Sequence, residues 1–439
     1  MEEYVKKIIW HMSHYALGNI IVTLSFFVSF PIFTRVFSQS EYGIMSIIGI
    51  TISLLSSVTL VGFPQAAVRF YSTKNEEKTR YTSTLVIGVI ITSSVAIFLF
   101  LFLSFFLLSF FDRYIINLIR FSIFAVLFSN ITSIFLAIVR SSQRTKLFNI
   151  LNVLKTYIPL FFSLLLILGF HMGVFGRFLG MIIGLILVCF IFYFIFKRDF
   201  GISINKNKFS KPLWKEMFLY GYAFSFSAIL SMLMTSGDRY VIQYYLGSAQ
   251  VGIYSVGYQL PIQIQMLIVS PLNLAIFPIV MEIWNKKGKK AVQNFLHKLL
   301  KYYSMLAIPV IFGFISISKD IITVFATEKF LGAEKIIPFI ITSIILYGGY
   351  FITYAGLMIY KKTNIIVKFL LIAVILNLAL NILLVPIIGI VGAAIATLIS
   401  YLFYTLYISF KSFNFLSFKI DYFAMVKYTT ISAIMFFII

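Results

Sequence analysis

The chain has 439 residues, of which 61% are hydrophobic and 11% are charged. In a water-soluble protein about a quarter of all residues are charged, so this composition excludes the soluble class. The 36 Lys and Arg residues against 14 Asp and Glu give a net charge of +22, a balance that also occurs in nucleic-acid-binding proteins. The basic residues lie in short segments between uncharged runs. This pattern indicates that they orient membrane spans rather than bind nucleic acid. The single cysteine, Cys189, excludes a disulfide framework and a CxxC redox pair.

Uncharged runs that are long enough to cross about 30 Å of hydrocarbon as helices recur along the whole chain. In the first half these runs cover residues 14–34, 42–68, 82–111, 114–139, 150–170 and 172–196. In the second half they cover residues 217–237, 251–281, 302–318, 336–360, 365–386 and 389–410. The sequence therefore predicts an all-α polytopic membrane protein with about twelve transmembrane helices.

The distribution of basic residues predicts the orientation of these spans. About three quarters of the 36 Lys and Arg residues fall on one side of the membrane when the spans are taken alternately. This side is the cytoplasmic one, because basic residues near span ends are retained there during insertion, where they also meet anionic lipid head groups. We expect the N-terminus to lie on this side and to be retained, since it has no small-residue cleavage site.

The two halves of the chain resemble each other weakly. The segment from Gly173 to Gly176 aligns with the segment from Gly389 to Gly392, and two further short matches, which begin at Tyr42 with Val251 and at Arg144 with Lys362, lie earlier in each half in the same order. We therefore expect two pseudo-symmetric six-helix bundles with a solute path between them. The predicted parts are an N-terminal lobe (1–198), a basic cytoplasmic linker (199–216), a C-terminal lobe (217–410) and a tail that could form a partial thirteenth helix (411–439).

Three cations lie within predicted spans, where an ionisable group costs about 2.5 to 3.5 kcal/mol at the membrane centre. They are Arg120, Lys155 and Arg177. Lys155 shares a polar stripe with Asn152 at helical spacing, so we expect it to face an interior, aqueous space. Arg120 and Arg177 lie nearer their helix ends, where they could instead extend to the head groups.

Arg35 and Arg239 form a further pair, each at the outer end of the first helix of its half. Arg239 follows Asp238 directly, so a local salt bridge is the alternative role for this cation. If these cations line the path, the transported species is anionic, because a phosphate or pyrophosphate would compensate them. All Asp and Glu residues fall in loops or at helix ends, so no mid-span carboxylate is evident, and no enzymatic or metal-binding motif occurs.

Several segments resemble bacterial polysaccharide flippases, the O-antigen and capsule branch of the multidrug/oligosaccharidyl-lipid/polysaccharide exporter superfamily. The resemblance covers the whole chain and is carried by PIFTRVFSQSEYGIMSIIG, FPQAAVRFYS, RTKLFNI, DRYVIQYYLGSAQVGIYSVGYQL and LNILLVPIIGIVGAAIATLISY. It implies a two-lobe exporter-flippase fold with a cationic cavity. Carried over by position, Arg35 and Arg69 match the family's basic residues around the first two helices, and Arg239 matches the one after the seventh.

The resemblance also implies a function. The protein would move undecaprenyl-pyrophosphate-linked oligosaccharide from the cytoplasmic to the periplasmic leaflet of the bacterial inner membrane by alternating access, for O-antigen, capsule or exopolysaccharide synthesis. It would use no cofactor and perform no covalent chemistry, and H⁺ or Na⁺ coupling stays unassigned. The expected partners are the lipid-linked oligosaccharide, membrane lipids, and polysaccharide polymerase and chain-length proteins.

Other functions fit the same composition. A multidrug or organic-cation antiporter of the same superfamily would require an embedded carboxylate, which the sequence does not display. A membrane enzyme such as an O-antigen polymerase would require a long outer loop with catalytic residues, whereas the longest predicted outer loop runs only from Lys319 to Lys335. A purely structural scaffold would not require interior cations.

Overall fold

The computed structural model describes residues 20–71, 75–106, 112–200 and 204–438. Nearly all of these described residues are helical and none of them lies in a β-strand, so the predicted all-α class is confirmed. The helices form two compact units: the first comprises Met1–Phe37 and Ile44–Ile229, and the second comprises Ser38–Gly43 and Leu230–Ile439. The lobe, linker and tail boundaries expected from the sequence stay predictions.

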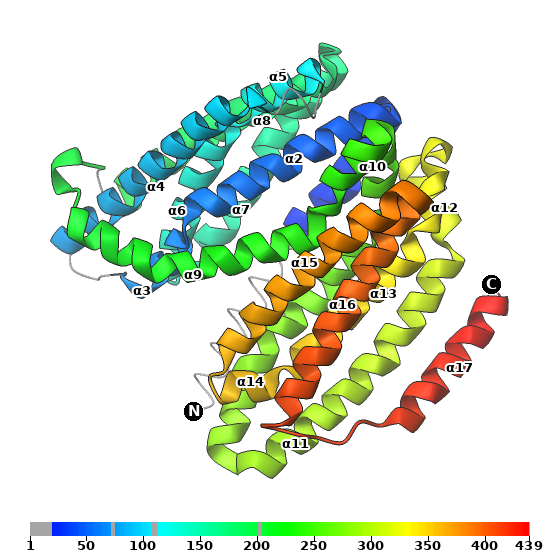
Figure 1. The fold of residues 1–439 in the computed structure, drawn as a ribbon. Coiled ribbons are helices and arrows are strands. Elements are labelled where there is room, and N and C mark those ends of the chain that lie inside the picture. Colours follow the sequence, from blue (N-terminus) through cyan, green and yellow to red (C-terminus); the bar gives the residue numbers. More distant parts are fainter. Residues whose placement is uncertain (1–19, 72–74, 107–111, 201–203, 439) are drawn as a thin grey trace. The chain divides into compact units, whose positions relative to one another are not determined.

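The first unit is built from helices of the N-terminal half (Figure 1). Its first described helix covers Ile20–Val36, and Ser38–Gly43, which include the start of the next helix, belong to the second unit. Its other helices are α2 (Gln39–Leu60), α3 (Phe63–Arg69), α4 (Asn75–Leu103), α5 (Arg113–Ser122), α6 (Phe124–Ser141), α7 (Thr145–Leu164), the π-helical turn η2 (Leu165–Gly169), α8 (Gly173–Phe200), the short 3₁₀ helix η3 (Lys206–Lys208) and α9 (Lys211–Ser236), which enters the second unit at Leu230.

Glycines allow α8 to pack closely against α7. A Cβ atom added to Gly180 would lie 2.4 Å from the backbone nitrogen of Ser163, and one added to Gly184 would lie 2.4 Å from the Cα atom of Pro159. Small residues at such contacts are typical of membrane helices, whose association depends on van der Waals packing and interhelical hydrogen bonds rather than on the hydrophobic effect. The small-residue face of α8 thus fixes α7 and α8 as a pair.

The second unit contains the remaining helices (Figure 1). They are α10 (Asp238–Ile264), the π-helical turn η4 (Gln265–Val269), α11 (Ser270–Ser316), α12 (Ser318–Ala326), the 3₁₀ helix η5 (Glu328–Lys335), α13 (Ile337–Thr353), α14 (Ala355–Ile359), α15 (Thr363–Ile388), α16 (Ile390–Phe413) and α17 (Tyr422–Ile438). The backbone leaves the helical conformation inside α10 at Gly247 (φ 80°) and inside α11 at Gly288 (φ 73°). Glycine is required there because a Cβ atom disfavours this positive φ.

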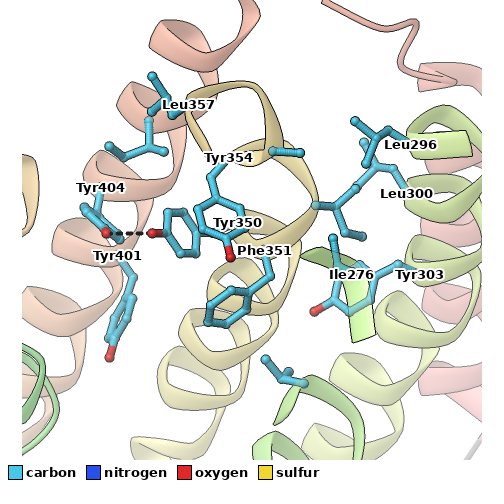
Figure 2. Packing of buried hydrophobic residues seen from close by; sticks show 14 of the residues in the cluster. Ile276, Leu296, Leu300, Tyr303, Tyr350, Phe351, Tyr354, Leu357, Tyr401 and Tyr404 are labelled. Atoms are coloured by element: carbon cyan, nitrogen blue, oxygen red, sulfur yellow. Dashed lines mark hydrogen bonds between the residues drawn. The ribbon is translucent and has the colours of Figure 1, made fainter. Parts of the chain in front are cut away.

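Tyrosines fill much of the core of the second unit, where α13 packs against α16 (Figure 2). The Tyr404 hydroxyl donates a hydrogen bond of 3.0 Å to the Tyr350 hydroxyl, and both side chains are buried. The rings of Tyr350 and Tyr354 lie 4.8 Å apart, and Leu296 and Leu300 of α11 belong to the same cluster. Each buried hydroxyl needs a partner of this kind, because an unpaired polar group away from water is costly.

By length and composition, eight helices among the described residues could cross a membrane, or up to nine if a bent pair counts as one span. The upper count of nine is lower than twelve for two reasons. One of the eight stretches, Phe224–Ser316, covers 93 residues and so includes most or all of three predicted spans. The first predicted span is described only from Ile20, as a shorter apolar helix, since its start lies outside the described residues. The chain is thus a multi-pass membrane protein.

The tail folds back as α17, which packs against α11. Lys301 Nζ donates to Asp421 Oδ2 over 2.7 Å, and the Asp421 Oδ1 atom accepts a hydrogen bond from the backbone N–H of Ala424 over 3.0 Å. The His297 ring also contacts the backbone oxygen of Lys419 at 2.7 Å. These polar contacts fix the connection that leads into the apolar helix.

Candidate functional site

Lys155 lies on α7 in the first unit and its charged end is held by α6. Its Nζ atom donates a hydrogen bond of 2.7 Å to the Ser133 hydroxyl and lies 3.4 Å from the backbone oxygen of Ser129. The Ser133 hydroxyl itself donates to the Ser129 oxygen over 2.8 Å. Cys189 of α8 lies close by, because its thiol donates to the backbone oxygen of Phe128, the residue before Ser129, over 3.5 Å. Lys155 is therefore a partly buried cation whose described partners are all formally neutral.

Arg177 lies on α8 and contacts α7 through another serine. Its guanidinium donates a hydrogen bond of 2.8 Å to the Ser163 hydroxyl, which is completely buried. Ser163 lies within hydrogen-bond distance of the Pro159 oxygen (2.7 Å) and of the Arg177 backbone oxygen (2.9 Å). The guanidinium carbon lies 5.1 Å from the centre of the Phe33 ring. The close approach of Gly180 to Ser163 brings α8 near enough for this contact.

Lys155 and Ser163, the hydrogen-bond partner of Arg177, lie eight positions apart on α7, which is about 12 Å along the helix axis. The structure therefore places Lys155 and Arg177 on neighbouring levels of the same helix pair in the first unit. Both are held by serine hydroxyls from an adjacent helix. Lys155 lies on α7 and Arg177 binds a side chain of α7, so both predicted cations are connected to this helix.

Arg120 occupies a different part of the first unit, in the last turn of α5. Its Nε atom donates to the Ser104 hydroxyl over 2.7 Å, and its guanidinium carbon lies 4.5 Å from the centre of the Phe105 ring. One terminal nitrogen of this guanidinium is buried and has no hydrogen-bond partner among the residues that the structure describes. Arg120 is partly buried, and its described contacts involve neither α7 nor α8.

Arg35 and Arg69 are exposed. Arg35 donates a hydrogen bond of 3.0 Å to the backbone oxygen of Pro31, one turn earlier in its helix. Arg69 ends α3, and its guanidinium carbon lies 4.5 Å from the centre of the Tyr220 ring of α9. Neither of these contacts connects Arg35 or Arg69 to Lys155, so their role in binding stays a prediction.

Arg239 lies in the second unit and forms the local salt bridge that its neighbour makes available. It donates a hydrogen bond of 2.8 Å to Asp238, and the side chains are only 5% and 1% exposed, respectively. It also donates to the Thr235 oxygen over 2.6 Å, and its guanidinium carbon lies 4.2 Å from the centre of the Tyr258 ring. The positive charge of Arg239 is thus compensated within the protein.

Asp238 is a buried carboxylate, which its place at a predicted helix end did not indicate. Its second oxygen accepts a hydrogen bond from the Tyr254 hydroxyl and lies 3.5 Å from Thr397, which in turn lies 3.5 Å from Asn377. A further amide, Asn381, donates to the backbone oxygen of Asn377 over 2.8 Å. The sequence signal for this polar cluster is the pair Asn377 and Asn381, four positions apart in an otherwise apolar span. Oxygens of these types suit hard cations, although Arg239 already neutralises the carboxylate.

Within the described residues, no group of three or more His, Cys, Asp or Glu side chains could hold a metal ion. The buried charged groups of the two units have different partners. The first supports Lys155 with neutral oxygens, whereas the second encloses an ion pair surrounded by tyrosines and amides.

Comparisons with known proteins identify the family and the fold of the chain. The model of a family described as "Polysaccharide biosynthesis protein" matches residues 5–284. A protein of Haloferax volcanii that is named as the probable low-salt glycan biosynthesis flippase Agl15 is 22% identical over 237 residues, which are 53% of this chain and 50% of that protein. That relative is therefore matched over about half its length.

Two solved structures share the fold. The lipid II flippase MurJ in an inward closed conformation superposes with a TM-score of 0.73 and 18% identity, over 98% of this chain and 92% of that chain. A multidrug resistance transporter of the MATE family in an inward-facing conformation gives a TM-score of 0.71 and 13% identity, over 92% of this chain and 95% of that chain. The predicted exporter-flippase fold is thus confirmed.

Proposed function

Because the chain belongs to the polysaccharide biosynthesis protein family, we propose that it is a flippase for undecaprenyl-pyrophosphate-linked oligosaccharide. It moves this lipid from the cytoplasmic to the outer leaflet of the bacterial inner membrane, with its own N-terminus on the cytoplasmic side. The likeness to glycan flippases supports a lipid-linked glycan as the substrate class. The undecaprenyl chain, the pyrophosphate and the use of the glycan in O-antigen, capsule or exopolysaccharide are the finer parts of the proposal.

The proposal rests on one observation: the positive charge of Lys155 has only neutral hydrogen-bond partners among the described residues. An ammonium group in a membrane-spanning helix is expensive, and in most membrane proteins it is paired or faces a water-filled cavity. Here the described partners of Lys155 are a hydroxyl and a backbone oxygen, so its net charge is retained. A retained positive charge inside a transporter attracts an anion, and the pyrophosphate is the anionic group of the proposed substrate.

In this mechanism the substrate's pyrophosphate binds Lys155 and Arg177, while the polyprenyl chain remains among the lipid tails. Moving the head group across the membrane needs no covalent step, only alternating exposure of the binding residues to the two sides. Arg35, Arg69 and Arg120 would contact the anionic head group earlier or later along its path. Arg239 would act with Asp238 as a neutral pair.

A multidrug or organic-cation antiporter is the second candidate, and the similarity to a multidrug resistance transporter favours it. Such a protein would use a carboxylate to bind its cationic substrate. The buried carboxylate of the second unit, Asp238, already forms an ion pair with Arg239. A drug-efflux assay separates the two candidates: the flippase gives no gain in drug resistance on expression.

The proposal is tested by deleting the gene in its host and scoring surface polysaccharide. We expect lipid-linked repeat units to accumulate on the cytoplasmic leaflet. Lys155→Ala and Arg177→Ala should each lower complementation although the proteins still insert, whereas Lys206→Ala, on the exposed 3₁₀ helix η3, should complement fully. Full activity of the double variant Lys155→Ala/Arg177→Ala at normal expression would contradict the proposed site.

A further inference from the structure

Ser133 is the residue through which α6 controls the charged end of Lys155. Its hydroxyl lies 2.7 Å from the Lys155 ammonium and 2.8 Å from the backbone oxygen of Ser129, one turn earlier. A lysine ammonium can only donate hydrogen bonds, so the serine oxygen must accept from it. The serine hydrogen is then directed at the Ser129 oxygen. This arrangement fixes the hydroxyl rotor and leaves its lone pairs facing the cation.

The chemistry of this partner matters because it is neutral. A carboxylate at the same position would form an ion pair and cancel the charge of Lys155, as Asp238 does for Arg239 in the second unit. An apolar residue would leave one N–H of the ammonium without a partner and allow the flexible side chain to move. A serine satisfies one donor, restrains the side chain and keeps the positive charge.

We propose that Ser133 is a positioning residue for substrate: it orients Lys155 toward a diphosphate while leaving its positive charge available. This inference rests on the proposed function, since it concerns how Lys155 meets an anionic head group. Ser133 does not touch the substrate and acts only through the ammonium. The remaining donors of Lys155 are then directed at the phosphate oxygens, where a charge-assisted hydrogen bond is strongest.

A purely structural role would make a different prediction for an acidic substitution. Ser133→Asp adds an ion pair with Lys155, so a residue that serves only to hold α6 against α7 would work as well or better after the change. A residue that preserves the charge of Lys155 would fail. The neutral isostere Ser133→Asn supplies the matched comparison, because it has almost the same shape as Asp and also offers an accepting oxygen.

The experiment uses the full chain in proteoliposomes and a fluorescent probe, a polyprenyl-pyrophosphate-linked N-acetylglucosamine. Its transport is followed by protection from a membrane-impermeant quencher. Ser133→Asp should lower the initial rate at least about tenfold, which corresponds to losing one charge-assisted hydrogen bond, without lowering the midpoint of thermal unfolding below that of Ser133→Asn. Ser133→Thr should restore most of the rate. Ser316→Ala, which removes a hydroxyl bonded to a backbone oxygen one turn earlier at 3.0 Å, should leave the rate unchanged.

A double-variant cycle decides the question even if Ser133→Asp does not insert. If Ser133 acts through Lys155, Ser133→Ala lowers the rate in the native background and has no further effect in a Lys155→Met background. Equal effects of Ser133→Ala in both backgrounds would overturn the inference, as would Asp and Asn variants with equal rates. If Lys155→Met alone leaves the rate unchanged, the proposed binding role of Lys155 fails instead, so the two failures are distinguishable.

Discussion

The buried ion pair of the second unit allows a quantitative prediction about stability. Asp238→Asn would leave the Arg239 guanidinium, 5% exposed, with the Thr235 oxygen and the Tyr258 ring as partners but without a counter-charge. Removing one member of a buried pair costs about 3 to 5 kcal/mol, because the remaining charge is left uncompensated. For a unit of about 200 residues this lowers the midpoint of thermal unfolding by on the order of 10 °C.

The assay heats samples of the detergent-solubilised protein to a series of temperatures. Size-exclusion chromatography then measures the folded fraction that remains, which gives the midpoint of thermal unfolding. The double variant Asp238→Asn/Arg239→Gln removes both charges, so it should be more stable than Asp238→Asn alone. Glu282→Gln is the control, since its pair with Lys286 is 55% and 47% exposed and should contribute at most about 0.5 kcal/mol. The reasoning is refuted if Asp238→Asn changes the midpoint no more than Glu282→Gln, or if the double variant loses the sum of both single effects.

Two further predictions concern helix packing and the tail. Gly184→Ala should destabilise the protein by about 1 to 3 kcal/mol, because the added carbon overpacks against α7. The control Gly49→Ala, with nothing within 4 Å of the added carbon, should be neutral or stabilising. Equal midpoints of thermal unfolding for the two variants would contradict the close approach of α8 to α7. Hydrogen bonding to Lys301 lowers the pKa of Asp421 below its ordinary value of 3.8, so this contact stabilises the docked α17 above about pH 4 and is lost as the pH falls through the lowered pKa. A spin label at Thr430 should become more mobile in that acidic range, and Asp421→Asn should show the same mobility at all pH values.

The sequence predicted the helical spans well because charge and length define them almost directly in a membrane protein. It could not predict where helices bend. Residues 282–301 contain many charged side chains and were expected to separate two spans, yet they are helical on both sides of Gly288, where the backbone of α11 turns. A helix leaving the membrane can continue in water, so charge marks the membrane surface rather than the end of the helix.

The candidate site was predictable only in part. Lys155 stands out in an apolar span, and this single signal led to the cation that the structure places against α6. Its partner Ser133 was not identified, because a single serine in an apolar helix is common and costs little free energy. Asp238 was missed for a different reason: residues 238–250 were expected to form an outer loop, whereas the structure makes them helical and buries the carboxylate. Burial follows from tertiary packing, which periodicity does not reveal.

The nearness of Cys189 to Lys155 has a practical consequence. Because the chain has no other cysteine, the native protein already contains a unique attachment point beside the candidate anion-binding residue. Thiol-reactive dyes or isotope-labelled methylthio groups would report on the chemical environment of that locus without any engineered background. Modification rates with negatively and positively charged reagents, compared in the presence and absence of pyrophosphate lipids, would show whether a bound lipid protects this thiol.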